Sequence, residues 1–194
     1  EDALALRVYS SRLIGQASDL VLHGGGNTSV KAEFSDIFDD RHEVLYVKGS
    51  GWDLATIEAP GFAPVALDAL LKLSRFDVLS DADMVRAQRA AMLDPGAPNP
   101  SVEAILHALI PFRFVDHTHA DAVVTLTNTP DGEARVREIY GDRLLVVPYV
   151  MPGFVLAKKV AQMTKDIDWS TLEGMILMNH GIFSFADDAR TSYT

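Results

Sequence analysis

Segments of two kinds alternate along this chain. Short apolar segments rich in β-branched residues are typical of buried strands, and longer segments whose apolar residues recur every three or four positions are typical of amphipathic helices. Strands are expected at residues 28–32, 43–47, 122–127, 144–147, 174–178 and 182–185, and helices at residues 4–16, 64–73, 80–93, 101–109, 132–140 and 152–163. Several strands are joined by short links, which favours a mixed sheet over a purely parallel one. The sequence therefore predicts an α/β fold of three layers, α/β/α, with helices on both faces of a mixed sheet.

The length of 194 residues suits one domain with a sizeable core. The Pro-rich stretch at residues 94–100 is too short to divide the chain, and the sequence contains no internal repeat. We therefore expect a single domain over residues 1–194.

The longest apolar run, residues 144–157, is interrupted by Pro148, Pro152 and Gly153. It is shorter than the roughly 20 residues that a membrane helix needs, so we expect it to lie in the core. Residues 1–6 carry two acidic side chains and no basic one, which does not resemble a signal peptide. The expectation is a cytoplasmic protein with no membrane partner.

The chain carries 17 Lys and Arg against 27 Asp and Glu, a formal net charge of −10. Binding to a nucleic-acid backbone needs clustered Lys and Arg, and none cluster here, so no nucleic-acid partner is expected. The chain has no cysteine, which excludes disulfides, thiolate nucleophiles and iron–sulfur clusters. Any metal ion must therefore be held by His, Asp or Glu.

Three histidines are candidate metal ligands. His117 and His119 alternate along an extended segment, which directs both imidazoles to the same side. His180 lies in a Gly-flanked break between two expected strands, from which its side chain can leave the edge of the sheet. Three neutral imidazoles with an open fourth position are typical of catalytic zinc. The alternative is that His117 and His119 are only polar residues at the end of a strand.

Glu103 is the candidate general base. It lies in the first turn of an expected helix, where the helix dipole favours a carboxylate without any function. Beside a divalent ion in a partly dry cleft, the same carboxylate could take a proton from the carbon next to a polarised carbonyl. His107, four residues further on, is interpreted as a packed or capping histidine, and His23 and His42 have no evident partner.

Two glycine-rich loops, at residues 23–27 and 48–51, suggest a site for a dianion such as phosphate. Backbone amides at Gly24–Gly26 and Gly49–Gly51 can donate to an anion, as can the side chains of Asn27, Ser50 and Ser101. Neither loop matches the Walker or dinucleotide-binding pattern. Lys31 and Lys48 could assist, although exposed lysines at strand ends are the simpler interpretation.

Five motifs in this order resemble the class II aldolase/adducin family over residues 13–185. They are Gly26-Asn27-Thr28-Ser29, Gly49-Ser50-Gly51, Pro100-Ser101-Val102-Glu103, His117-Thr118-His119 and Asn179-His180-Gly181. The stretch at residues 100–128 is especially similar to the aldolase portion of rhamnulose-1-phosphate aldolase/short-chain dehydrogenase fusions.

This resemblance implies a largely antiparallel central sheet and a homotetramer with active sites between subunits. It implies a divalent ion, most often Zn²⁺, on His117, His119 and His180, with Glu103 as the acid/base. The substrate phosphate would be held by Asn27, Ser50, Gly51 and Ser101. The family's usual second serine is replaced by Val102, which removes one side-chain donor. A proton-donating tyrosine near the C-terminus cannot be assigned to Tyr193.

The implied activity is that of a metal-dependent aldolase, a carbon–carbon lyase. It would cleave a ketose 1-phosphate, with rhamnulose 1-phosphate as the first candidate, into dihydroxyacetone phosphate and a hydroxyaldehyde. The metal ion would stabilise the enediolate left by cleavage. The alternatives are a sugar-phosphate epimerase, decarboxylase or dehydratase on the same site, or an adducin-like binding module without catalysis.

Overall fold

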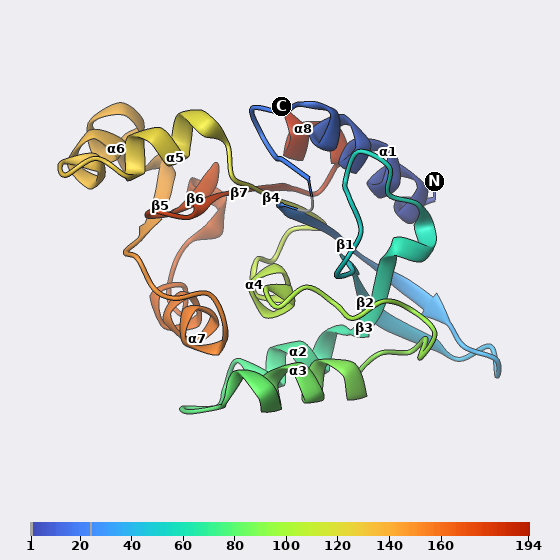
Figure 1. The fold of residues 1–194 in the computed structure, drawn as a ribbon. Helices are drawn as coiled ribbons and strands as arrows, with labels where there is room; N and C mark the ends of the chain where they lie inside the picture. Colours follow the sequence, from blue (N-terminus) through green and yellow to red (C-terminus); the bar gives the residue numbers. More distant parts are fainter. Residues whose placement is uncertain (1, 24) are drawn as a thin grey trace.

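The centre of the molecule is one mixed β-sheet (Figure 1). The computed structural model describes residues 2–23 and 25–194. Within these residues a seven-stranded sheet has the order β3-β2-β1-β4-β7-β6-β5. All neighbouring strands are antiparallel except β5 and β6, which are parallel. The strands are β1 (Asn27–Ser35), β2 (Arg41–Lys48), β3 (Phe62–Ala66), β4 (Phe114–Thr118), β5 (Leu144–Val147), β6 (Gly174–Leu177) and β7 (Gly181–Ala186).

Helices cover both faces of this sheet, which confirms the predicted three-layer α/β/α sandwich. One face carries α1 (Ala3–Gln16), α5 (Asp121–Thr127), α6 (Gly132–Tyr140) and α8 (Ala189–Tyr193), and the other carries α2 (Leu67–Leu73), α3 (Asp81–Ala90), α4 (Ala104–Leu109) and α7 (Phe154–Met163) (Figure 1). Short 3₁₀ turns occur at Ala59–Gly61, Gly141–Arg143 and Trp169–Thr171. In the described part of the chain, no helix is long and apolar enough to cross a membrane.

The core is divided by the sheet into clusters on its two faces. On one face, Leu45 and Val65 of the sheet pack with α2, α3 and α4, and Phe183 and Phe185 pack with α4 and α7. On the other face, Ile176 packs with α5 and α6. The apolar residues of the strands are therefore buried on both sides, as a three-layer fold requires.

Two local expectations gave the wrong type of element. Residues 122–127, expected as a strand, form α5, in which the buried Val123 and Thr127 are four residues apart on one helical face. The expected helix at residues 64–73 begins only at Leu67, because residues 62–66 form β3 beside β2. β3 is the edge strand of the sheet, where the missing N–H of Pro64 costs no ladder hydrogen bond.

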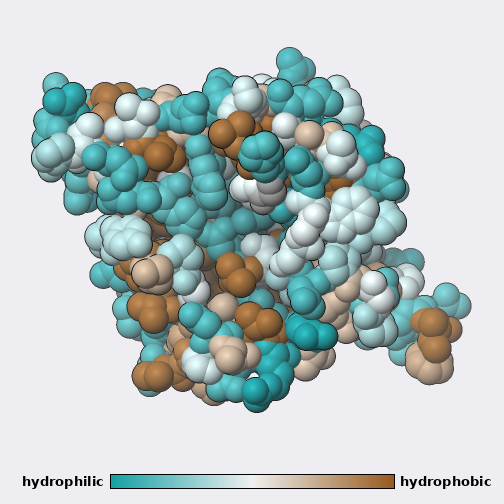
Figure 2. All heavy atoms as spheres, in the orientation of Figure 1, coloured by the Kyte–Doolittle hydropathy of each residue, from teal (hydrophilic) through white to brown (hydrophobic). Residues whose placement is uncertain are grey.

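The hairpin formed by β1 and β2 extends away from the body of the molecule. Its tip carries two exposed apolar side chains, Ile37 at 91% and Phe38 at 77% exposure, and the apolar tip stands out at the right of the space-filling view (Figures 1 and 2). Such a tip on a protruding hairpin is an apolar surface available to another molecule.

A buried ion pair fixes α1 to the sheet. The guanidinium of Arg7 lies 2.5 Å from the carboxylate of Asp116, and both side chains are at most 1% exposed. Arg7 also donates to the carbonyl oxygen of Ser29 at 3.2 Å, and the hydroxyl of Ser192 donates to Asp116. The pair therefore joins α1, β1, β4 and α8.

Replacing Arg7 with methionine should lower the free energy of unfolding by about 3–5 kcal/mol, because it leaves the charge of Asp116 buried and unpaired. Urea unfolding followed by circular dichroism measures this loss. The matched control is Arg86→Met, which breaks an exposed pair with Asp83 and should cost less than about 1 kcal/mol. Equal losses in the two variants would contradict the structural role of the buried pair.

Candidate active site

All of the predicted site residues except His117 line one cavity of about 400 Å³. It lies where the loops after β2 and before α4 approach the ends of β1, β4 and β7. Its walls include the residues predicted for anion binding, the candidate base and two of the candidate metal ligands: Asn27, Ser50, Gly51, Ser101, Glu103, His119 and His180. Val102 and Pro152 also line it, and Figure 2 shows mostly hydrophilic side chains around the middle of this face.

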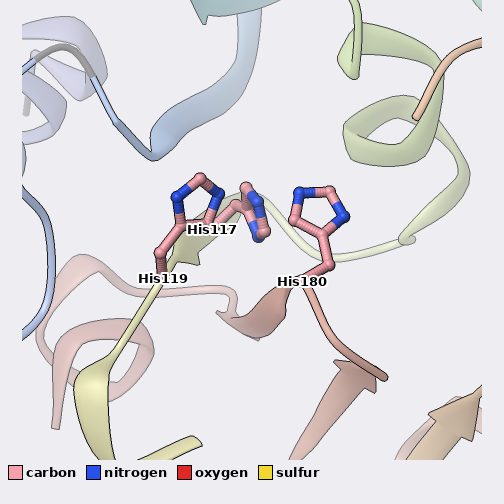
Figure 3. Close-up of side chains that lie close together, drawn as sticks. All are labelled: His117, His119 and His180. Atoms are coloured by element: carbon pink, nitrogen blue, oxygen red, sulfur yellow. The ribbon is translucent and has the colours of Figure 1, made fainter. Parts of the chain in front are cut away.

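The three candidate metal ligands come together from two neighbouring strands. His117 is the fourth residue of β4, His119 follows the end of that strand, and His180 lies in the turn between β6 and β7. One ligand nitrogen from each histidine lies within 4.8 Å of the others. Figure 3 shows the three rings gathered in one place.

The turn that carries His180 depends on its two neighbours. Asn179 has a positive φ of 59°, and its side-chain amide donates to the carbonyl oxygen of Thr127 at 3.1 Å. Asparagine tolerates this left-handed conformation better than most residues do. A Cβ on Gly181 would lie 2.3 Å from the carbonyl oxygen of Thr118. Glycine is therefore required for β7 to begin this close to the end of β4.

Replacing Gly181 with alanine should lower the free energy of unfolding by about 2 kcal/mol or more and weaken metal binding, because the backbone at His180 must move. Chemical unfolding and titration with Zn²⁺ measure the two effects. Gly96→Ala is the control, since a Cβ there would meet only the exposed side chain of Asp94 at 3.2 Å. Unchanged zinc affinity in Gly181→Ala would contradict the proposed role of the turn.

The buried histidine nitrogens fit a metal ion. The Nδ1 of His117 lies 3.1 Å from the carbonyl oxygen of Ile182 and can donate to it, which leaves a lone pair on Nε2. His117 Nε2 and His180 Nδ1 are buried, and neither has a hydrogen-bond partner among the described residues. Burial lowers the pKa of His117 to about 4, and burial also lowers the pKa of His119. Both imidazoles are thus neutral at pH 7, the form that binds a metal.

Glu103 lies directly beside these nitrogens. Its Oε2 is 3.5 Å from His117 Nε2, and its Oε1 is 3.4 Å from His180 Nε2. Burial raises the pKa of this carboxyl, but the nearby imidazoles of His117 and His180 and a hydrogen bond from Asn27 outweigh it, so the pKa lies below its usual value. Glu103 is therefore ionised at neutral pH and can accept a proton.

Fewer backbone amides of the two glycine-rich loops are free to bind an anion than the sequence suggested. The backbone amides of Gly25, Gly49 and Ser50 donate to the carbonyl oxygens of Leu22, Gly61 and Asn99. These three amides are used within the fold, so the predicted cradle of free amides is smaller than expected. Gly24, another predicted donor, lies outside the described residues. The side chains of Ser50 and Ser101 and the backbone at Gly51 remain beside the cavity.

Neither lysine is the exposed strand-end residue that we expected. Lys48 is only 6% exposed and lines the cavity, and burial lowers its pKa. Lys31 instead donates to three carbonyl oxygens at the end of α4, those of His107, Ile110 and Phe112, at 2.6–2.9 Å. Its ammonium group therefore caps α4 and does not line the cavity.

The other histidines and the C-terminal tyrosine have distinct positions. His107 is fully buried and lies next to the site, as a packed histidine bonded to Ser29 and Asn27. His42 contacts Asp36 in the β1–β2 hairpin, away from the cavity. Tyr193 lies on α8 and lines a separate groove with α1.

Known proteins resemble this chain in sequence and in fold. A family model described as "Class II Aldolase and Adducin N-terminal domain" matches residues 6–194. "Uncharacterized oxidoreductase YuxG" of Bacillus subtilis (strain 168) is 38% identical over 186 residues, which are 96% of this chain and 27% of that protein. The chain thus spans about a quarter of that relative, which is consistent with the resemblance to aldolase–dehydrogenase fusions.

Two solved structures show the same fold. The N-terminal class II aldolase domain of a conserved protein from Thermoplasma acidophilum is 41% identical, with a TM-score of 0.90 over 100% of this chain and 87% of that one. L-fuculose-1-phosphate aldolase from Thermus thermophilus is 17% identical, with a TM-score of 0.55 over 94% of this chain and 81% of that one. At that identity the second likeness concerns the fold alone.

Proposed function

The chain belongs to the class II aldolase and adducin family, and from this premise we propose that it is a metal-dependent aldolase. The substrate is a ketose 1-phosphate, with rhamnulose 1-phosphate as the first candidate. The products are dihydroxyacetone phosphate and a hydroxyaldehyde. One observation carries the proposal: three imidazoles with ligand atoms within 4.8 Å of one another lie beside a buried carboxylate.

In this proposal, His117, His119 and His180 hold a divalent ion, most simply Zn²⁺. Once bound, the ion draws electron density from the carbonyl oxygen of the substrate and makes the adjacent carbon more acidic. His117 is the most buried of the three ligands, and its hydrogen bond to Ile182 keeps the ring oriented.

Glu103 moves the proton. In the synthesis direction the ionised carboxylate removes a proton from the carbon next to the carbonyl of dihydroxyacetone phosphate, and in cleavage the protonated group returns it. Oε1 is the oxygen available for this transfer, since it is buried and has no hydrogen-bond partner in the described part of the chain. Oε2 is already held by the amide of Asn27.

The phosphate is bound in the same cavity by Ser50, Gly51 and Ser101, with a contribution from Asn27. The hydroxyl of Ser101 accepts from the backbone N–H of Glu103 at 3.2 Å, so the anion site and the acid/base group share one turn of chain. Val102 is 46% exposed and presents an apolar side chain to the same cavity. Its phosphate contact is therefore limited to the backbone.

The proposal includes a homo-oligomer, with a tetramer as the first candidate. The exposed Ile37 and Phe38 at the tip of the β1–β2 hairpin support a contact between copies of the chain. Tyr193 on α8 is not assigned as the proton donor. Light scattering on the purified protein measures the mass of the assembly.

The decisive experiment incubates the zinc-loaded protein with dihydroxyacetone phosphate and a panel of 2-hydroxyaldehydes. We expect new ketose 1-phosphates, detected by mass spectrometry, and solvent deuterium in dihydroxyacetone phosphate even without an aldehyde. A protein that forms no ketose phosphate and exchanges no deuterium contradicts the aldolase proposal. The same preparation is then assayed for epimerisation, decarboxylation and dehydration of sugar phosphates. A protein that stays metal-free after zinc is supplied favours the adducin-like binding module.

A further inference from the structure

We propose that His107 is a positioning residue, which fixes the Glu103 carboxylate through the side-chain amide of Asn27. This inference rests on the proposed function of Glu103 as the group that moves the proton. His107 is fully buried and does not line the cavity, so it acts through Asn27 and not on the substrate.

Three side chains connect the interior of the protein to Glu103. The Ser29 hydroxyl lies 2.8 Å from Nδ1 of His107. Nε2 of His107 is hydrogen-bonded to Oδ1 of Asn27, and Nδ2 of Asn27 donates to Oε2 of Glu103 at 2.7 Å. All four side chains are at most 8% exposed, so little water competes for these bonds.

The chemistry of the groups fixes the direction of each bond. An ionised carboxylate only accepts hydrogen bonds, so Asn27 must present its NH₂ group to Glu103. Its oxygen then faces His107, whose Nε2 must carry the hydrogen. In a neutral imidazole Nδ1 is consequently an acceptor, and the hydroxyl of Ser29 donates to it. Ser29 thus donates to His107, His107 donates to Asn27, and Asn27 donates to Glu103.

His107 is held rigidly enough to serve this purpose. It is four residues after Glu103, and its backbone N–H donates to the carbonyl oxygen of Glu103 at 3.2 Å. Its ring packs edge-to-face against Phe183 with 5.2 Å between ring centroids. Phe183 also stacks on His117 at 4.3 Å. One aromatic ring therefore packs against both His107 and a candidate metal ligand.

The two carboxylate oxygens of Glu103 therefore have different roles. Asn27 holds Oε2, which leaves Oε1, a buried oxygen without a hydrogen-bond partner among the described residues, to move the proton. Without His107, the Asn27 amide can rotate and place its oxygen against the carboxylate, which repels it. The metal ligands are not altered by that rotation. Loss of His107 should therefore reduce the rate of proton transfer more than it reduces binding.

The test compares His107→Phe, which removes both ring nitrogens, with His107→Gln, whose amide can still donate to Asn27. We expect His107→Phe to lower kcat by about tenfold or more, with KM and zinc content within about twofold of wild type. We expect His107→Gln to recover most of that loss. Thr164→Val is the control, because it removes a buried hydrogen bond to Val160 at the C-terminal end of α7, and Thr164 does not line the cavity.

A wild-type kcat in His107→Phe would overturn the proposal. The proposal would also be overturned if His107→Phe and His107→Gln lost kcat and bound zinc to the same extent. If His107→Phe does not fold, Ser29→Ala gives the measurement, with an expected fall in kcat of about threefold and no recovery by added zinc.

Nitrogen-15 NMR of the zinc-loaded protein separates this inference from the proposed function. We expect His107 to carry its hydrogen on Nε2 alone. If the wild-type protein has no lyase activity, the proposed function fails. The Nε2 tautomer would still support the hydrogen-bond chain to Glu103, whereas a hydrogen on Nδ1 would overturn it.

Discussion

Replacing Glu103 with glutamine should lower the rate of aldol cleavage by about 10³-fold without loss of zinc. Glutamine keeps the shape of the side chain and can still accept a hydrogen bond from Asn27 at its amide oxygen. Its amide can neither remove a proton from carbon nor return one, so proton transfer stops in both directions while the imidazoles keep their positions. Single-turnover cleavage and metal analysis of the same preparation measure the two quantities.

The control for this variant is Glu133→Gln. Glu133 is exposed on α6, where it pairs with Arg137 one turn away, so its replacement should leave activity unchanged. Solvent-deuterium exchange into dihydroxyacetone phosphate gives a second measure of the same proton transfer. Wild-type exchange in Glu103→Gln would show that another group moves the proton.

Replacing His117 with alanine should abolish both zinc binding and cleavage. His117 is fully buried, and one of its ring nitrogens lies within 4.8 Å of a ring nitrogen of each of the other two candidate ligands. Two histidines alone make a much weaker site than three. A ligand that binds only the native state raises its stability, by about 2.7 kcal/mol at a hundred times Kd. Zinc should therefore raise the Tm of the wild-type protein and not that of the variant.

The matched control is His42→Ala. His42 is a histidine of the hairpin, bonded to Asp36 at 2.9 Å and distant from the cavity, so its loss should leave zinc affinity and activity intact. Calorimetric titration with Zn²⁺ gives the affinities. Full zinc affinity in His117→Ala would contradict the assignment of this histidine as a ligand.

Local patterns in the sequence predicted most of the elements. The helix at residues 132–140 and the strand at residues 144–147 have the expected bounds. The error at α5 has a tertiary cause. β4 is paired with β1 on one side and β7 on the other, so the apolar segment that follows it finds no free place beside that strand. It packs as a helix on the face of the sheet instead.

The candidate site was predicted from residue types, whereas its hydrogen bonds were not. Nothing in the local sequence shows that the amides of Gly49 and Ser50 are used within the fold, or that Lys48 is buried at the cavity. His107 was interpreted as packed, and its connection to Asn27 could not be foreseen. The only signal was its spacing of four residues from Glu103.

By itself, the sequence determined the chemistry that is available: an all-nitrogen set of candidate metal ligands, a carboxylate and two loops with hydroxyl and amide donors. These depend on residue identity and on short-range periodicity, which are properties of the chain alone. The tertiary structure decided which groups meet. Asn27 lies opposite His117 because of the register between β1 and β4, and it bonds to His107, 80 residues away. Register is fixed by the burial of whole strands. For this reason the orientation of Glu103 is a property of the fold, although its presence is a property of the sequence.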